Sequence, residues 1–416
     1  MKMPASTGGE RLIVATAARI PDHVRPEQVY ELDIYRDSRL LADVHAGYAE
    51  VQKEAPPIFF TPENGGHWVV TRFDLISEIV RDPETFSASQ MQIPPVKDAP
   101  TFIPLNLDPP DNLPYRQILM PWFAPRSIHA MDGYLKELAT ELVDSVASKG
   151  GCDFVADIAA RYPVGVFMRM MGLPMDKFDD FRRIVVKFFS SQGQSEVVEL
   201  AQIINAEMAL VIEARRKERK DDLVSHLLDA DLKGRPLTPE ELASMCFLLF
   251  IAGLDTVTNG LTFGMRHIAA RPDLQARLRA EPDKIEAAVE EVLRLFGVVN
   301  TPRILTRDCE RFGVSFRKGE MLLNLLPMAG HDDGKNADPE AFDLDRKKRE
   351  YLTFSTGPHL CIGHFLARSE MKMLFAEWFS RIPEFRIADG YTERFRAGTV
   401  MSLESLDLVW DAAAAK

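Results

Sequence analysis

The segment from Thr238 to Ala270 restricts the fold more than any other part of the chain. Thr238 is an N-cap residue, Pro239 suits the first turn, and Glu241 completes a capping box. The helical pattern continues to Ala270, which corresponds to a helix roughly 48 Å long at about 1.5 Å per residue. Its centre, residues 245–251, is apolar on nearly every side, so the helix must be buried and the chain must pack around it.

The centre of this helix also holds residues that a purely structural helix avoids. Gly253 costs about 1 kcal/mol relative to alanine, and a buried carboxylate at Asp255 costs more unless it is paired. Several unfavourable residues within one buried turn, 252–256, indicate a function. The alternative is a closely packed glycine together with a threonine, Thr256, that donates to the carbonyl four residues earlier.

The remaining periodicity predicts a mainly α fold with small β-sheets. A chain of 416 residues with 46% hydrophobic content has enough apolar side chains for a large core. We expect a flexible N-terminal arm over residues 1–25 and a single domain over 26–411. Its helical part should lie mainly at 115–296, and its β-rich part mainly at 50–72 and 300–410.

Individual elements follow from the same patterns. Helical periods occur at 74–81, 128–149, 158–172, 176–191, 196–218, 221–229, 284–296 and 364–381. Runs of β-forming residues predict strands near 68–71, 303–306, 311–316 and 320–325, and a strand pair within 394–410. Residues 87–110 are rich in Pro, Gln and Asp and weakly periodic, so we expect a long ordered loop there.

Charge and cysteine usage exclude several classes of protein. The formal net charge of -12 argues against nucleic acid as a partner. The four cysteines are widely spaced without a Cys-x-x-Cys pair, which disfavours a disulfide framework or a zinc site and fits a reducing cytosol. Residues 1–11 contain no apolar run long enough for a signal peptide or a membrane span, so we expect a cytoplasmic protein without a membrane partner.

One cysteine, Cys361, lies in a loop punctuated by Gly357 and Gly363 and followed by the predicted helix at 364–381. Before a helix N-terminus, the dipole and the free N–H groups favour a thiolate over a thiol. The glycines let the backbone turn tightly and approach a flat ligand, and a thiolate is a soft ligand for iron. The alternative is a buried structural cysteine.

The complete pattern around this cysteine is Phe-x-x-Gly-x-His-x-Cys-x-Gly, formed by Phe354, Gly357, His359, Cys361 and Gly363. It resembles the haem-ligand signature of the cytochrome P450 family. The resemblance implies haem b as cofactor, with Cys361 as the axial thiolate of the iron. It also implies a fold shaped as a triangular prism, with haem between the long central helix and the helix after the cysteine loop.

The centre of the long helix resembles the oxygen-binding motif of the same family, (Ala/Gly)-Gly-x-Asp-Thr. The resemblance implies that Ala252 and Gly253 make room over the iron for dioxygen. It further implies that Thr256 hydrogen-bonds the reduced oxygen species and that Asp255 relays protons from solvent.

Supporting positions follow from the resemblance as well. Glu291 and Arg294 match the family's Glu-x-x-Arg pair and, with Arg346 as a third member, are expected to lock the core around the cysteine loop. A surface ion pair is the alternative. The two haem propionates need cationic or donor partners, for which the candidates are Arg116, Arg303, His359 and, more weakly, Asn112.

Several stretches resemble the soluble bacterial branch, closest to the camphor hydroxylase subfamily. They are 64–68, 102–104, 108–110, 253–257, 303–306 and 381–383. The tyrosine that binds camphor in that subfamily is absent from residues 98–102, which puts camphor itself in doubt. We expect a compact hydrophobic substrate, terpenoid or norisoprenoid and ionone-like, in a pocket that includes Gln92, Thr101, Phe188, Leu248, Ile251, Val299, Thr399 and Val400.

The implied reaction converts R–H, dioxygen, two electrons and two protons into R–OH and water. No flavin or nicotinamide motif is visible, so the resemblance implies a [2Fe–2S] ferredoxin served by a flavin-dependent reductase. A basic patch of Arg72, Arg116, Lys347, Lys348 and Arg368 would receive this acidic donor, unless the run at 346–349 is simply a solvated face.

Two rival classes of protein are compatible with the same residues. One is a haem-thiolate enzyme that uses peroxide or does not oxygenate, which would not need the proton relay of Asp255 and Thr256. The other is a haem-free enzyme with a nucleophilic Cys361 and His359 as its base.

Overall fold

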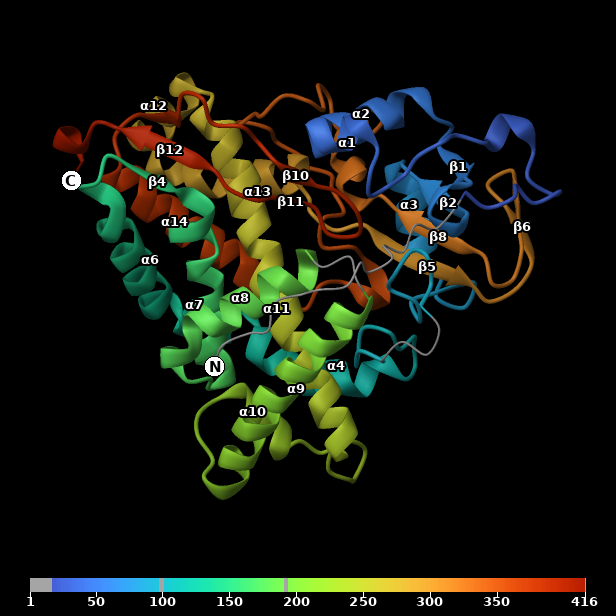
Figure 1. Ribbon diagram of the computed structural model, residues 1–416, viewed down its shortest axis with the longest axis horizontal. Helices are drawn as coiled ribbons and strands as arrows, with labels where there is room; N and C mark the ends of the chain where they lie inside the picture. Colours follow the sequence, from blue (N-terminus) through green and yellow to red (C-terminus); the bar gives the residue numbers. More distant parts are fainter. Residues whose placement is uncertain (1–16, 97–100, 191–193, 416) are drawn as a thin grey trace, which may run out of the picture.

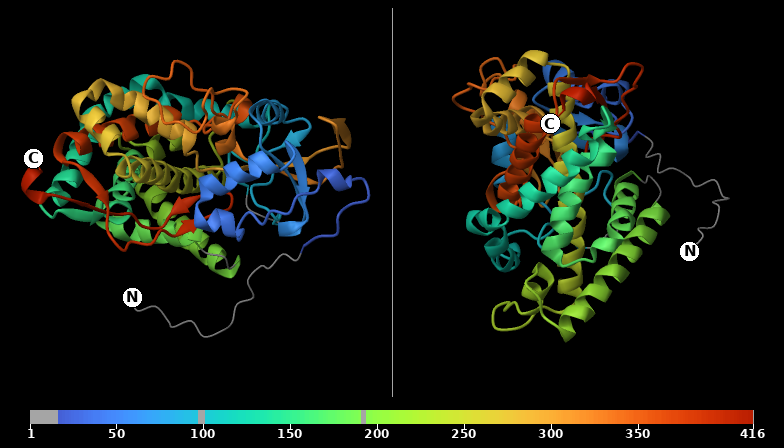
Figure 2. Two further views of the ribbon diagram at one scale, coloured as in Figure 1. Left: turned by 90° about the horizontal axis from the view of Figure 1, so that it is seen from above. Right: turned by 90° about the vertical axis from the view of Figure 1, so that its left-hand side faces the viewer.

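The computed structural model describes residues 17–96, 101–190 and 194–415. In Figure 1 these residues have a roughly triangular outline, with helices at the left and below and the largest β-sheet at the right. The two views of Figure 2 show the same division into a larger helical part and a smaller β part. The predicted mainly α fold with small sheets is confirmed.

The α-helices are α1 Ser38–Ala42, α2 Val44–Glu54, α3 Phe73–Val80, α4 Asn112–Phe123, α5 Pro125–Ala130, α6 Asp132–Ala147, α7 Arg161–Met171, α8 Phe178–Ser190, α9 Gln194–Lys217, α10 Leu223–Leu228, α11 Pro239–Ala269, α12 Pro272–Ala280, α13 Ile285–Leu295 and α14 His364–Arg381. The strands are β1 Ile58–Thr61, β2 His67–Val70, β3 Phe86–Ser87, β4 Gly151–Asp153, β5 Thr301–Leu305, β6 Cys309–Arg311, β7 Val314–Phe316, β8 Met321–Asn324, β9 Phe385–Ile387, β10 Phe395–Arg396, β11 Ser402–Leu403 and β12 Asp407–Trp410.

Helix α11 runs through the middle of the molecule (Figures 1 and 2). Its predicted capping box is present, because Glu241 N donates to Thr238 Oγ1 at 3.2 Å and Thr238 N donates to Glu241 Oε2 at 2.7 Å. Met245 and Phe250 in its centre are fully buried. Among the described helices it alone has the length and hydropathy of a membrane span, but 61% of that apolar window is buried inside the molecule, as in a core helix.

The largest sheet has five strands in the order β1-β2-β8-β5-β3. Its central pair, β2 and β8, is parallel, with Trp68 opposite Leu322. Trp68 is fully buried, and its Nε1 donates to Glu320 Oε2 at 2.9 Å. Residues from distant parts of the chain therefore share one small apolar core beside the helical part.

Two strand predictions need correction. Residues 311–316 do not form one strand, because Phe312 and Gly313 have φ of 56° and 73° and turn the chain between β6 and β7. The stretch 394–410 is more than one strand pair. Strands β10 and β11 pair with each other, whereas β12 lies between β4 and β9 in a separate sheet.

Residues before the predicted domain boundary at residue 26 already pack against the domain. Residues 1–16 lie outside the described part, but Ala18 N donates to Pro62 O at 2.7 Å. Val24 is 7% exposed and belongs to the small apolar core beside the largest sheet.

A buried ion cluster joins α13 to the segment that precedes the cysteine loop. Glu291 and Arg294 are fully buried and bonded at 2.8 Å, and Arg346 Nε lies 3.2 Å from Glu291 Oε1. Arg349, which the sequence analysis did not identify, adds a third guanidinium at 2.9 Å from the same oxygen. Burial alone would raise the pKa of Glu291, but the bonds and charges of Arg294 and Arg346 outweigh it and lower that pKa.

Candidate functional site

Cys361 lies between the short helical turn Gly357–His359 and α14, as the loop pattern predicts. Its N–H donates to Phe354 O at 2.9 Å, which closes the loop. Gly357 has a φ of 70° and would bring a Cβ to 3.0 Å from Arg81, so glycine is required there. Cys361 is exposed, so its sulfur is accessible to a ligand.

The predicted preference for a thiolate is not a property of this loop alone. Burial raises the pKa of the Cys361 thiol, while a backbone hydrogen bond from Gly363 and the charges of Arg116 and Arg368 only partly oppose it. A metal ion bonded to the sulfur would favour the thiolate.

The centre of α11 also has accessible positions. Ala252 is exposed and Thr256 is half-buried, although Ile251 and Leu254 beside them are buried. Residues four apart share one face of a helix, so Ala252 and Thr256 line the same space. Thr256 Oγ1 donates to Ala252 O at 3.3 Å, the alternative that the sequence left open for this hydroxyl.

Gly253 has a packing reason of its own. A Cβ at this position would lie 2.5 Å from the Phe167 ring on α7, closer than real side chains approach. The absent side chain therefore lets α7 and α11 come together. Ala252 is exposed and Gly253 is half-buried.

Asp255 is 8% exposed and is held by a residue that sequence reasoning missed. Its Oδ2 accepts from Arg396 Nη2 of β10 at 3.3 Å. Burial raises the pKa of Asp255, and the Arg396 charge opposes this shift. No sequence spacing links the two residues, because Arg396 reaches α11 from the C-terminal hairpin.

Two predicted propionate partners have cationic groups without an acidic partner. Arg303 is 5% exposed, and its Nη1 donates to the carbonyl of Pro302 at 2.7 Å. Arg116 Nη2 donates to Leu360 O at 2.6 Å, in the cysteine loop itself. Among the described residues, no carboxylate lies within 4.0 Å of either guanidinium. Burial lowers the pKa of Arg303 to about 10, and the charge of Asp108 only partly opposes this shift.

The remaining polar candidates lie on the same elements. His359 Nε2 is 3.3 Å from Asp108 Oδ1, and burial lowers the pKa of His359 in spite of that contact. Asn112 on α4 is fully buried, and neither Nδ2 nor Oδ1 finds a partner among the described residues. Two cations without a carboxylate within 4.0 Å among the described residues, an unused amide and an accessible cysteine match a ligand with two carboxylates and a metal. These residues therefore fit haem.

The predicted substrate residues are only partly brought together. Leu248 and Ile251 are buried at 8% and 6% exposure, and Val299 pairs with Val400 in an isolated β-bridge. Thr399 is half-buried beside Val400. The exposed Thr101 is tied to α11, because its carbonyl accepts from Ser244 Oγ at 2.6 Å. Gln92 is exposed, and the side chain of Phe188 on α8 lies outside the described part.

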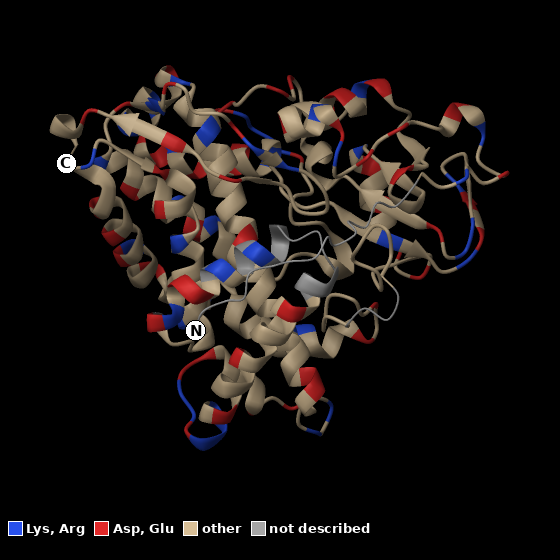
Figure 3. Cartoon of the chain, in the orientation of Figure 1, with Lys and Arg blue, Asp and Glu red and all other residues tan. Residues whose placement is uncertain are grey.

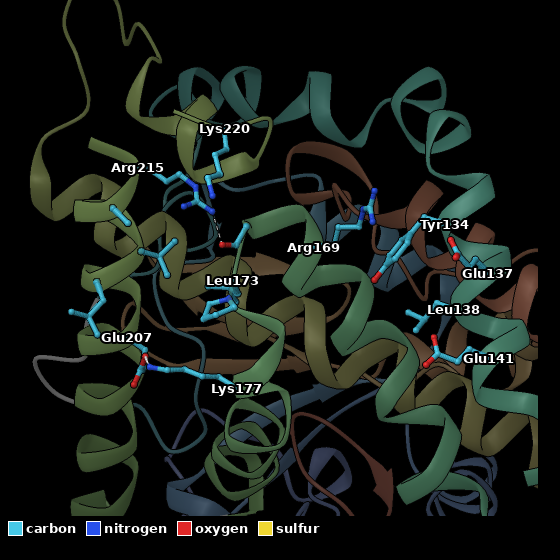
Figure 4. Close-up of a pocket in the computed structure, with 15 residues that line it drawn as sticks. Tyr134, Glu137, Leu138, Glu141, Arg169, Leu173, Lys177, Glu207, Arg215 and Lys220 are labelled. Atoms are coloured by element: carbon cyan, nitrogen blue, oxygen red, sulfur yellow. Dashed lines mark hydrogen bonds and ion pairs between the residues drawn. The ribbon is translucent and has the colours of Figure 1, made fainter. Parts of the chain in front are cut away.

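A large hollow elsewhere is not this site. It measures about 840 Å³ and lies between α6, α7 and α9 (Figure 4). Its wall includes Arg169, Arg215 and the ion pair of Lys177 with Glu207 at 2.5 Å. None of the predicted site residues lines it.

The predicted basic patch is largely neutralised. Arg72 pairs with Asp333 at 3.1 Å, Lys348 with Glu350 at 2.5 Å, and Arg368 with Glu290 at 2.7 Å. In Figure 3 basic and acidic residues are interspersed over the elements. The long-range attraction of an acidic partner should therefore be weaker than the sequence suggests, because fewer basic side chains are unpaired.

Comparison with known proteins now identifies the family. The cytochrome P450 family model matches residues 164–383. "Probable cytochrome P450 127A1" of Sinorhizobium fredii is 32% identical over 404 residues, which cover 94% of this chain and 97% of that protein. The steroid C26-monooxygenase of Mycobacterium tuberculosis is 30% identical over 364 residues, 85% of this chain and 97% of that one.

Two crystal structures are similar along almost the whole chain. CYP101J2 has a TM-score of 0.88 and 35% identity, and covers 95% of this chain. CYP101C1 has a TM-score of 0.88 and 30% identity, and covers 94% of this chain. All of each crystallised chain is matched. The protein described here therefore belongs to the cytochrome P450 family of haem-dependent monooxygenases, with haem b as its cofactor.

Proposed function

We propose that this P450 hydroxylates a compact hydrophobic molecule of terpenoid or norisoprenoid size, such as an ionone. The observation that carries the proposal is the exposure of two residues, Cys361 in the cysteine loop and Ala252 on the otherwise largely buried centre of α11. Apolar residues of α11 next to Ala252, Leu248 and Ile251, favour an apolar substrate held by shape. No tyrosine hydroxyl stands in residues 98–102 to anchor a ketone.

In this proposal Cys361 is the iron ligand, and Arg116, Arg303 and His359 hold the two propionates. The unpaired guanidiniums of Arg116 and Arg303 support these roles, because two negative charges would neutralise them. Asn112 adds an amide donor on the helix of Arg116. Haem supplies the dioxygen and one-electron chemistry when it is bound.

The chain's own part in the reaction is to exclude water and to deliver protons. Asp255 takes a proton from solvent, and Thr256 passes it on from its Oγ1. For this transfer the hydroxyl must release the Ala252 carbonyl, while Arg396 holds Asp255 next to it in the chain. The apolar residues around 248–251 limit stray water near the reacting atoms.

We further propose that electrons come from a [2Fe–2S] ferredoxin reduced by a flavin-dependent reductase, and that the protein is cytoplasmic. Arg116 and Lys347 are the members of the predicted basic patch without an acidic partner among the described residues. A donor that docks on so few free cations should depend only modestly on salt.

The test of the iron ligand is a reduced-carbonyl spectrum of purified protein. The wild type and Cys309→Ala should show the band of a thiolate-ligated haem, and Cys361→Ala should lose it. Cys309 on β6 is a suitable control because it is half-buried and outside the site. A band retained in Cys361→Ala, or a colourless wild type, would refute the assignment.

A second experiment tests substrate and electron source. Ionones and bicyclic terpene ketones should shift the haem spectrum and be hydroxylated with ferredoxin, ferredoxin reductase and NADH. Long-chain fatty acids, as the contrasting panel, should do neither. Turnover supported by hydrogen peroxide but not by ferredoxin would favour the peroxide-using alternative.

A further inference from the structure

Arg368 on α14 makes a hydrogen bond from each nitrogen of its guanidinium group. Its Nε donates to Glu290 Oε1 at 2.7 Å, its Nη2 to Tyr351 Oη at 2.7 Å and its Nη1 to His364 O at 3.1 Å. Tyr351 Oη in turn donates to Glu290 Oε2 at 2.5 Å. Every nitrogen of this guanidinium therefore has a partner, so its position is fixed rather than averaged over rotamers.

The same guanidinium rests on the cysteine loop. Its Cζ lies 4.6 Å from the centre of the Phe354 ring, in a cation–π contact. The carbonyl of Phe354 accepts the N–H of Cys361 at 2.9 Å. A chain of contacts thus runs from Glu290 on α13 through Arg368 and Phe354 to the predicted iron ligand.

The field of this fixed charge acts on the cysteine loop, because Phe354 is both the ring under the guanidinium and the residue whose carbonyl accepts the Cys361 N–H. Arg368 and Glu290 are 31% and 27% exposed, so water screens this field only in part. The nearby His364 does not add a second cation, because burial and Arg368 lower its pKa.

We propose that Arg368, held by Glu290 and Tyr351, is a positioning residue that sets the reduction potential of the haem iron by fixing one positive charge beside the Cys361 loop. This inference rests on the proposed function, because it requires haem bound through Cys361. Reduction adds one negative charge to the haem and its ligand. A fixed cation stabilises the reduced state and raises the potential, and a fixed anion does the opposite.

The two partners must then act with opposite signs. Arg368→Gln removes the cation and leaves Glu290 unopposed, so the potential should fall. Glu290→Gln removes the anion and leaves Arg368 unopposed, so the potential should rise. Arg368→Lys keeps the charge and should stay near the wild type, and the double variant Arg368→Gln/Glu290→Gln should lie between the two single variants.

The experiment is a spectroelectrochemical titration of each purified, haem-loaded variant at low and at high ionic strength. Both single shifts should shrink as salt is added, since the pair is partly exposed. Shifts of the same sign in the two single variants, or no shift in either, would overturn the inference and leave only a structural link between α13 and α14.

The outcome is distinguishable from failure of the proposed function. If the wild type bound no haem, or bound it without Cys361, there would be no thiolate-type reduced-carbonyl band in the control spectrum. If Arg368→Gln did not fold, Glu290→Gln alone would still decide the sign, because a loosened loop gives no reason for a higher potential.

Discussion

Glu370 offers the sharpest test of the energetics of this fold, because it is a carboxyl buried without a partner. It lies on α14, is 2% exposed, and has no hydrogen-bond or ion partner among the described residues. Burial raises the pKa of Glu370 from 4.5 to about 8. At neutral pH the folded protein therefore keeps a proton that the unfolded chain has lost.

The sign and size of the effect follow from linkage. The raised pKa of Glu370 does not lower the free energy of unfolding below pH 4.5, where the carboxyl is protonated in both states. Between pH 4.5 and about 8 it lowers the free energy of unfolding by an amount that grows with pH. With about 1.36 kcal/mol per pKa unit, the penalty is about 1 kcal/mol at pH 5 and about 3 kcal/mol at pH 7. Glu370→Gln has the shape of the protonated side chain and carries no such penalty.

We therefore expect Glu370→Gln to be more stable than the wild type, by a margin that grows with pH. Urea unfolding followed by tryptophan fluorescence at pH 5, 6 and 7 would measure it, with Glu141→Gln on α6 as an exposed control. All other pH effects cancel in the difference. Parallel stability curves for the two proteins would mean that Glu370 ionises normally, and the reasoning from its burial would be wrong.

Three further predictions concern the site and its support. Glu291→Gln leaves buried guanidiniums without their carboxylate and should cost about 3–5 kcal/mol in urea unfolding; a loss below 1 kcal/mol would make the cluster an ordinary surface network. Gly253→Ala should cost about 1–3 kcal/mol through contact with Phe167, and Phe167→Leu in the same chain should restore part of it; without restoration the clash is not the cause. Arg396→Gln removes the cation that opposes the effect of burial, so the pKa of Asp255 should rise. The acidic limb of the pH profile of dioxygen consumption should therefore shift to higher pH. An unchanged pH profile would show that Arg396 does not act on the proton path.

Local signals predicted the long-range architecture where they were complete. The Thr238 capping box marks the start of α11, and the helix expected at 364–381 is α14 with the same limits. The pair Glu291 and Arg294 is buried as expected, since its helix is apolar around it. In each case one short stretch contains the whole physical cause, so no knowledge of distant residues is needed.

The missed features depend on partners that are far apart in sequence. Strand β12 pairs with β4, and Arg396 binds Asp255 across 141 residues, which no spacing rule anticipates. Strand β3 has only two residues, Phe86–Ser87, and exists because β5 lies next to it. The direction of the Cys361 pKa is also set by distant residues, because their burial of the thiol raises it against the effect of the local hydrogen bond from Gly363.

The parallel pair of β2 and β8 has a consequence for how this protein is made. The Trp68 indole and the Glu320 carboxylate that it bonds are 252 residues apart, so they emerge from the ribosome at very different times. Until β8 has been translated, the hairpin of β1 and β2 has no neighbour for its inner edge, and its buried aromatic face is open to wrong partners. The cysteine loop follows later still. We therefore expect assembly of the haem pocket to be one of the last events of synthesis, with chaperones guarding the early hairpin until then.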